Sequence, residues 1–217
     1  EMGSFYLDII KDRQYTSKSD GHPRKSAQTA IYHIAHALVR WLAPILSFTS
    51  EEIWNVLPKT TNLPIQLCEW YTELESFDSE DELDLSFWAK MQEIRSEVNR
   101  ILEIKRNDNL IKASLEAKIT LYADNNISDM LGKLGEELRF LLITSEADLK
   151  PISEKPENAV TSTIDGLYVD IQKVEKPKCE RCWHRSDTVG TNTEHPEICI
   201  RCIDNITTQN GEYRRYA

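Results

Sequence analysis

The residues of this sequence that could do chemistry are four cysteines near its C-terminal end. They form two Cys-x-x-Cys pairs, Cys179 with Cys182 and Cys199 with Cys202, with sixteen residues between the pairs. Two such pairs at this separation are typical of a tetrahedral site, because each pair forms a tight turn that directs both sulfur atoms at one ion. Zinc fits best, since it has no redox chemistry and prefers thiolates in a closed tetrahedron, although iron can occupy the same geometry. We predict one zinc ion per chain, in a structural site.

Two other interpretations of the cysteines find little support in the composition. Four cysteines could form two disulfides, but the sequence shows no signal peptide and no other cysteine-rich region, and disulfides are typical of oxidising compartments. A redox-active Cys-x-x-Cys pair would need a βαβ context, whereas both pairs lie in a polar segment. Together with the absence of a long apolar run, this predicts a cytoplasmic protein without a membrane segment.

Basic and aromatic residues surround the cysteines. Arg181 lies inside the first pair, and Trp183 directly follows it. A tryptophan beside a metal-held turn could offer a flat face on which a nucleobase stacks. It could equally cap a small apolar core over the metal. The spacing alone leaves both interpretations open.

The charge distribution restricts where a nucleic acid could bind. The net charge of −10 is unlike that of a general nucleic-acid binder. The acidity is concentrated in residues 61–175, which carry 12 basic and 24 acidic side chains. Residues 1–60 and 176–217 each carry 7 basic and 6 acidic side chains. A binding site for a polyanion is therefore expected to be local and to lie near the ends of the chain.

Apolar residues in the first half recur at helical spacing. The pattern predicts a helix over residues 1–16, a long helix from Arg24 that Pro44 kinks or ends, and a helix over residues 85–106. The basic residues of this last helix, Arg95 among them, are expected on its solvent face. The sequence also begins within a helical pattern, without a capping residue, so we expect the chain to be part of a longer protein.

Two short motifs lie within the helical region. Thr49-Ser-Glu-Glu52 fits a capping box at the start of a helix, with Phe48 and Ile53 at the positions of a hydrophobic staple. His33-Ile-Ala-His36 is similar to a synthetase nucleotide-binding motif and to a metal pair, but it lacks the glycine and lies within a helix. Its histidines are expected to be structural.

The pattern changes after residue 111. Alternating apolar residues predict a strand over residues 117–122, helical spacing returns over residues 126–142, and Asp165-Gly166 predicts a hairpin over residues 160–171. The fold class is therefore mainly α. We expect a helical bundle over residues 1–111, a small α+β unit over residues 112–175 and a zinc-ribbon-like four-cysteine module over residues 176–217.

Several stretches resemble class I aminoacyl-tRNA synthetases for aliphatic amino acids. Residues 5–13, 30–49 and 51–54 resemble their anticodon-binding helices. The motifs Cys-Glu-Arg-Cys-Trp at residues 179–183 and Cys-Ile-Arg-Cys at residues 199–202 resemble the C-terminal zinc module of the bacterial isoleucyl-tRNA synthetase family. The resemblance covers essentially the whole chain, and the valyl and leucyl relatives lack this zinc module.

This resemblance implies that the chain is the tRNA-recognition part of an isoleucine–tRNA ligase, with tRNA(Ile) as its partner. The whole family enzyme activates isoleucine with ATP, and its catalytic and editing domains would lie upstream, so this chain itself is expected to be non-catalytic. The resemblance further implies a monomer without an obligate protein partner.

The resemblance also gives roles to single residues. It implies that Trp183 stacks on an anticodon base and that Arg181 contacts a base edge or a phosphate. Arg13 and Arg24 are candidates for contact with the anticodon stem, because they are arginines at helix ends in a region of almost no net charge.

Two other classes of protein remain open from the sequence. Formamidopyrimidine-type DNA-repair glycosylases end in a related four-cysteine finger, but they need an N-terminal catalytic proline and glutamate, and this sequence starts with Glu-Met-Gly. A zinc ribbon that binds only other proteins is the second alternative.

Overall fold

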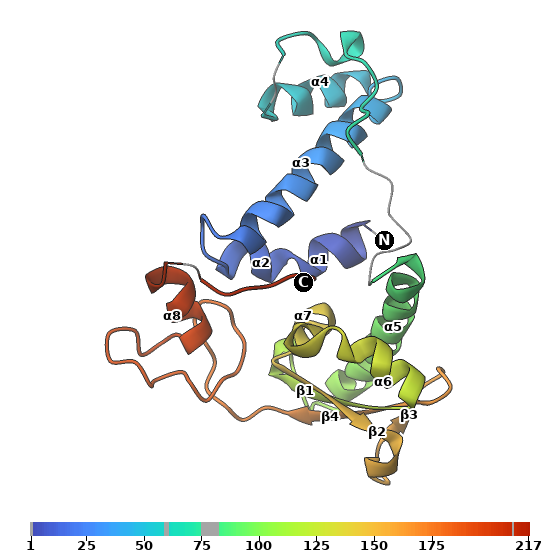
Figure 1. The fold of residues 1–217 in the computed structure, drawn as a ribbon, viewed down its shortest axis with the longest axis vertical. Helices are drawn as coiled ribbons and strands as arrows, with labels where there is room; N and C mark the ends of the chain where they lie inside the picture. The colour runs from blue at the N-terminus through green and yellow to red at the C-terminus, as the bar shows by residue number, and fades with distance from the viewer. Residues whose placement is uncertain (1, 59–60, 75–82, 210) are drawn as a thin grey trace. The chain divides into compact units, whose positions relative to one another are not determined.

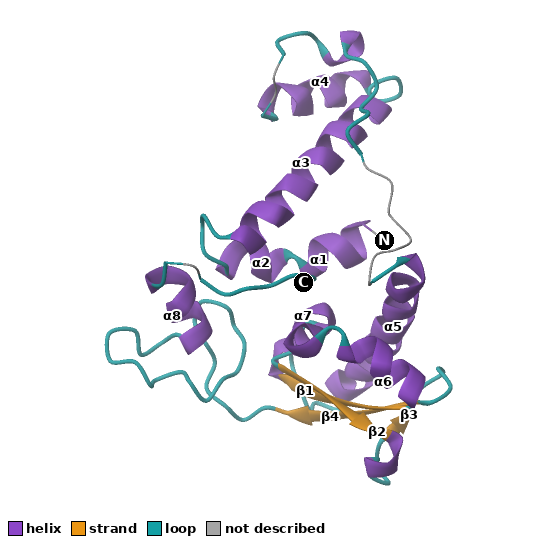
Figure 2. Ribbon diagram, in the orientation of Figure 1, coloured by secondary structure: helices purple, strands orange, loops and turns teal. Residues whose placement is uncertain are grey.

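The computed structural model describes residues 2–58, 61–74, 83–209 and 211–217. The chain forms two compact units, one over residues 25–78 and one that combines residues 1–24 with residues 79–217 (Figure 1). About half of the chain is helical, and a small sheet lies in the second unit (Figure 2). The helical bundle and the three-part division given above stay predictions.

The unit of residues 25–78 is built on α3 (His22–Leu42), from residue 25 onward, and α4 (Ser47–Val56). Its core is Trp54, which packs with Val39, Ala43 and Ile65. The indole N–H of Trp54 donates to the carbonyl of Leu63 at 2.9 Å, so the polar atom of this buried ring is satisfied. The end of α3 just before Pro44 confirms the predicted helix end.

The capping box expected at Thr49 is wrong. α4 begins two residues earlier, at Ser47, and the side chain of Phe48 is almost fully exposed, so no staple forms. The turn after α3 leads directly into α4, because the N–H of Leu46 donates to the carbonyl of Leu42 and that of Ser50 donates to Leu46. Thr49 is therefore already inside the helix, where no free N–H needs its hydroxyl.

The two histidines of α3 have structural partners, as expected. The Nε2–H of the buried His36 donates to the carbonyl of Pro58 at 2.8 Å. His33 Nδ1 lies 2.6 Å from the hydroxyl of Tyr71. These contacts tie α3 to the segment that follows α4.

The second unit contains a four-stranded sheet in the order β2-β1-β4-β3. β1 pairs with β2 in parallel, whereas the other two pairs are antiparallel. The strands are β1 (Ala117–Ala123), β2 (Glu146–Pro151), β3 (Val160–Thr161) and β4 (Leu167–Lys173). The predicted strand and the hairpin at Asp165-Gly166 are confirmed. β2 escaped prediction because it is a polar edge strand that ends in proline, with no alternating apolar pattern.

Helices α5 (Leu85–Asn107), α6 (Asn125–Gly132) and α7 (Leu138–Leu142) contact the sheet. The predicted helix over residues 126–142 is interrupted at Gly135, whose φ is +49°. The predicted inner stripe of α5 is confirmed, since all its members are buried: Phe87, Met91, Ile94, Val98 and Ile101.

The expectation that Arg95 lies on the solvent face of α5 is wrong. Its guanidinium is buried, donates to the carboxylate of Asp8 at 2.7 Å and donates to the carbonyl of Ser4 at 3.0 Å. The start of the chain packs over this part of α5. A helical pattern cannot reveal this cover, because the partner lies more than eighty residues away.

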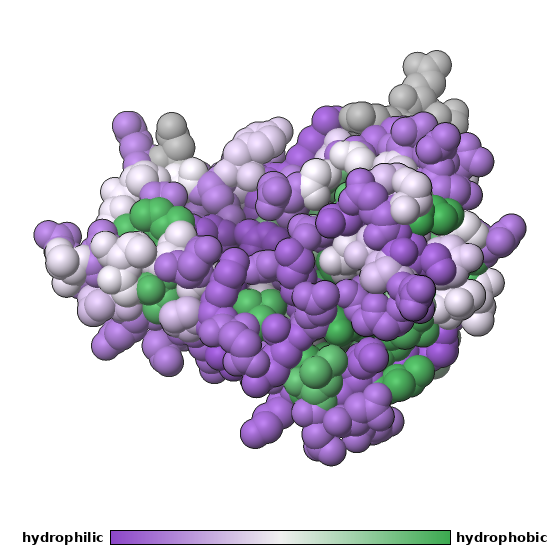
Figure 3. All heavy atoms as spheres, turned by 90° about the horizontal axis from the view of Figure 1, so that it is seen from below, coloured by the Kyte–Doolittle hydropathy of each residue, from purple (hydrophilic) through white to green (hydrophobic). Residues whose placement is uncertain are grey.

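The predicted helix over residues 1–16 consists of a π-helical turn at Met2–Tyr6, then α1 (Leu7–Ile9) and α2 (Lys11–Thr16). Near the C-terminal end, α8 (Ile200–Thr207) follows the second cysteine pair. The molecular face in Figure 3 is mostly hydrophilic, with hydrophobic residues in separate patches. Within the described parts of the chain, no helix has the length and apolar character needed to cross a membrane.

Gly166 and Gly132 provide a matched test of this fold. Gly166 has a φ of +77°, and a Cβ atom there would lie 2.4 Å from the carboxylate of Asp124, whereas a Cβ on Gly132 in α6 would meet nothing within 4 Å. We expect Gly166→Ala to lower the free energy of unfolding by about 1–3 kcal/mol. Gly132→Ala should raise it by about 0.5–1 kcal/mol. Urea unfolding of both variants measures the difference, and effects of equal sign would contradict this structure of the hairpin.

Candidate metal centre and nucleic-acid interface

The four predicted cysteines come together in the second unit. Their sulfur atoms all lie within 4.8 Å of one another, and all four residues are buried. The Sγ atoms of Cys179 and Cys202 are 3.7 Å apart, as are those of Cys182 and Cys199. A tetrahedral zinc ion with zinc–sulfur bonds of about 2.3 Å places its sulfur ligands about 3.8 Å apart. The donor set and its spacing therefore fit a zinc ion.

Local backbone structure brings the two pairs together. In the first pair, the N–H of Trp183 donates to the carbonyl of Cys179 at 2.9 Å, and the N–H of Cys179 donates to the carbonyl of His184 at 2.9 Å. The second pair lies at the start of α8, where the N–H of Cys199 donates to the sulfur of Cys179 at 3.3 Å. The positive end of a helix dipole stabilises a thiolate. Hydrogen bonds with Cys182 and Cys202 lower the pKa of the Cys199 thiol.

The metal module, which we define as residues 178–205, is fixed to α2 by partly buried ion pairs. The carboxylate of Asp12 accepts two hydrogen bonds from Arg201, at 2.7 and 2.9 Å, and another from Arg214. Burial by itself would raise the pKa of the Asp12 carboxyl, but the hydrogen bonds and charges of these arginines outweigh it and hold the pKa well below its ordinary value. Asp12 is therefore ionised wherever the fold is intact near neutral pH.

Phe140 of α7 lies beside the same arginines. The guanidinium carbons of Arg214, Arg139 and Arg201 lie 3.6, 4.2 and 5.0 Å from the centre of its ring. Cations over an aromatic face are attracted by the ring quadrupole. The ring thus stabilises three like charges that lie close to it, and it contributes α7 to the contact between the module and α2.

Trp183 does not cap a core over the metal. Its side chain is 60% exposed, and the apolar residues that pack against the cysteines are Val189 and Ile198. The backbone of Trp183 is left-handed, with φ at +66°. The ammonium of Lys178 lies 5.3 Å from the centre of the indole ring. The module therefore presents this indole to solvent with a cation beside it.

The predicted arginines lie in three different environments. Arg181 is half-buried and donates from its guanidinium to the carbonyl of Thr16 in α2. Arg24 is half-buried in the first turn of α3. Arg13 is buried and donates to the carbonyl of Ala217 at 2.9 and 3.2 Å, so its guanidinium serves a contact within the chain. Of these three, only Arg181 lies at the metal module.

Sequence reasoning missed the residues that α2 contributes. Asp12 fixes the module, and Tyr15, a residue that is 75% exposed, lies on the same short helix. No signal in the sequence linked them to cysteines that come more than 160 residues later. Lys178, the cation beside the indole, directly precedes Cys179, so its position in the sequence could have identified it as a residue of the metal module.

Comparison with known proteins separates the alternatives that the sequence left open. Residues 1–121 match the anticodon-binding domain of tRNA ligase, and residues 176–205 match the zinc finger found in FPG and IleRS. The finger is shared by two classes of protein, so it does not distinguish them. The match over residues 1–121 favours the tRNA ligase and not the DNA-repair glycosylase.

Relatives with similar sequences are named isoleucine–tRNA ligases. The isoleucine–tRNA ligase of Francisella philomiragia subsp. philomiragia is 70% identical over all 217 residues, and those of Francisella tularensis subsp. tularensis and subsp. novicida are 69% identical. The chain spans 23% of the length of each of these relatives. The match to the anticodon-binding domain covers more than half of the residues of this chain. The chain therefore belongs to the family of anticodon-binding domains of tRNA ligases.

Proposed function

We propose that this chain is the part of an isoleucine–tRNA ligase that binds the anticodon loop of tRNA(Ile), with Trp183 stacking on a loop base. The family match and the names of the relatives support a tRNA partner. The activation of isoleucine with ATP and its transfer to tRNA would belong to parts of the longer protein outside this sequence. The observation that carries the proposal is the conformation and exposure of Trp183.

A tryptophan at position 183 destabilises the folded chain, because its backbone has a positive φ. A bulky residue with positive φ costs roughly 1–3 kcal/mol, whereas glycine adopts the same conformation without strain. Burial recovers little of this cost, because 60% of the side chain stays exposed. Stability of the chain therefore does not account for the indole, but stacking on an unpaired base does.

Zinc would give this stacking surface its rigidity. Cys179, Cys182, Cys199 and Cys202 would hold one ion per chain in a closed tetrahedron, which leaves no position for catalysis at the metal. The ion would fix the turn in which Trp183 N–H and the carbonyl of Cys179 are bonded. Lys178 beside the ring, and Arg181 in the turn, would supply positive charge for the RNA backbone.

The other predictions from the sequence concern the stem contacts, the division of the chain, its oligomeric state and its location. Arg24 stays a candidate for contact with the anticodon stem. The burial of Arg13 gives that residue no support in the same role. The division into parts at residues 111 and 175, a monomeric state and a cytoplasmic location are also proposals, on the grounds given in the sequence analysis.

Removal of the metal should disorganise the module. We expect elemental analysis to find one zinc ion per purified chain. A chelator should then expose residues 178–205 to limited proteolysis and weaken binding to an RNA hairpin that carries the isoleucine anticodon loop, because the ion contributes about 10–16 kcal/mol to modules of this kind. Cys199→Ser should reproduce the effect, and Cys68→Ser, which changes the one cysteine outside the cluster, should not. A chain without metal would contradict the proposal.

Replacing Trp183 by glycine separates a role in RNA binding from a role in folding. Trp183→Gly relieves the backbone strain, so zinc content and the urea midpoint should be retained or slightly raised. Affinity for the same hairpin should fall about 5- to 150-fold, which corresponds to roughly 1–3 kcal/mol for one stacked base. Trp70→Ala is the matched control, since Trp70 is 62% exposed in the other unit. Unchanged RNA affinity would exclude stacking, and loss of zinc would make Trp183 a structural residue.

A further inference from the structure

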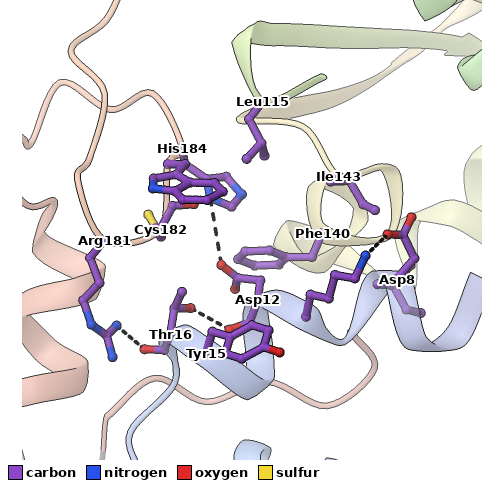
Figure 4. Close-up of a pocket in the computed structure, with 13 residues that line it drawn as sticks. Asp8, Asp12, Tyr15, Thr16, Leu115, Phe140, Ile143, Arg181, Cys182 and His184 are labelled. Atoms are coloured by element: carbon purple, nitrogen blue, oxygen red, sulfur yellow. Dashed lines mark hydrogen bonds and ion pairs between the residues drawn. The ribbon is translucent and has the colours of Figure 1, made fainter. Parts of the chain in front are cut away.

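A cavity of about 440 Å³ lies between α2, the end of α7 and the metal module. Figure 4 shows Tyr15 and Thr16 from α2, Phe140 and Ile143 from α7 and its end, and His184 from the module around its interior. Leu115 adds an apolar wall. Trp183 also lines this cavity, so the exposed indole and the cavity form one continuous site.

A second exposed aromatic ring lines the same cavity. Tyr15 is 75% exposed and Trp183 is 60% exposed, so burial in the chain explains neither ring. One comes from α2 and the other from the metal module, which are separated by more than 160 residues in the sequence. Two aromatic rings on one apolar cavity make a site suited to a flat aromatic ligand.

Backbone strain is concentrated at this cavity. Among the described residues, three other than glycine have a positive φ: Asn109, Ile143 and Trp183. Asparagine tolerates this conformation, but a β-branched isoleucine and a tryptophan do not. Both of these unfavourable residues line the cavity. Strain of this kind persists where the surrounding structure enforces it, commonly at ligand-binding positions.

The walls of the cavity are held in place. Arg201 of the module donates to the Asp12 carboxylate at 2.7 and 2.9 Å, and Arg181 donates to the carbonyl of Thr16. These contacts join α2 directly to the turn that carries Trp183. A ligand would therefore meet a preformed site and would lose little affinity to ordering it.

Charge at the cavity suits a polyanion that carries aromatic groups. The Lys11 side chain lines the cavity and is 67% exposed, and Lys178 lies beside the indole. Two acidic residues in the lining are paired with arginines, Asp8 with Arg95 and Asp12 with Arg201. Lys11 also donates to Asp8, so a phosphate would replace this exposed contact. An RNA loop offers phosphates for the lysines and a base for the apolar interior.

We propose that this cavity takes one unstacked nucleobase of a single-stranded RNA loop, with Tyr15 as a second stacking residue beside Trp183. The inference rests on the proposed function, which it extends from one exposed ring to a two-walled base pocket. It assigns to α2 a direct part in RNA binding, in addition to its contact with the metal module.

The test is a series of Tyr15 variants of the zinc-loaded chain, titrated with an RNA hairpin that carries the isoleucine anticodon loop. Tyr15→Ala should weaken binding by at least about 5-fold, whereas Tyr15→Phe, which keeps the ring, should bind like the unchanged chain. Because the ring is exposed, neither change should alter zinc content or the urea midpoint. Tyr213→Ala is the matched control, since Tyr213 is 79% exposed and does not line the cavity.

Hairpins that lack one base at a time identify the base in the pocket. At one loop position, removal of the base should weaken binding, and Tyr15→Ala should then have no additional effect, because residue and base act as one unit. Additive effects at every position would overturn the proposal.

Two outcomes separate the pocket from the proposed function. If Trp183→Gly weakens binding and Tyr15→Ala does not, the pocket is wrong and RNA stacking on Trp183 stands. If neither variant changes affinity, both proposals are wrong.

Discussion

The second unit depends on a partly buried carboxylate, that of Asp12, which accepts hydrogen bonds from the guanidinium groups of Arg201 and Arg214. Arg214 is buried, and a buried charge that loses its partner is strongly destabilising, so Arg214 requires the Asp12 carboxylate. The depressed pKa of Asp12 means that the ionised form stabilises the folded state. This contribution is complete above the carboxyl's ordinary pKa of about 4 and is lost as the pH falls below it. At neutral pH, the metal module is therefore fixed to α2.

The metal and the ion pairs of Asp12 would stabilise different parts of the structure: the metal the interior of the module, and the ion pairs its contact with α2 and α7. Four thiolates around one ion would fix the two turns of the module, a region too small to be held by a hydrophobic core of its own. The Asp12 cluster then fixes the finished module against α2 and α7, with the Phe140 ring beside the arginines. The metal would fix the turn that carries Trp183. The ion pairs of Asp12 bring α2 and α7, with Tyr15 and Phe140, to the same cavity.

The same arrangement would allow an acidic chain to bind RNA at this cavity, as proposed above. The acidic residues are concentrated in the middle of the sequence, while the lysines and the two exposed rings at the cavity come from segments with almost no net charge. The backbone is strained at two residues that line this cavity, Ile143 and Trp183. Hydrogen bonds and ion pairs of the surrounding structure stabilise the fold against that strain.

By itself, the sequence determined the features that depend on local spacing. These are the cysteine pairs, the inner stripe of α5, strand β1 and the Asp165-Gly166 hairpin, because ligand geometry and side-chain periodicity act over a few residues. Only the tertiary structure decided that Arg13 and Arg95 are buried, that Trp183 is exposed, and that Tyr15 lies at the metal module. Each of these depends on a contact between distant segments, and hydrophobic periodicity contains no information about which segment will cover a given face.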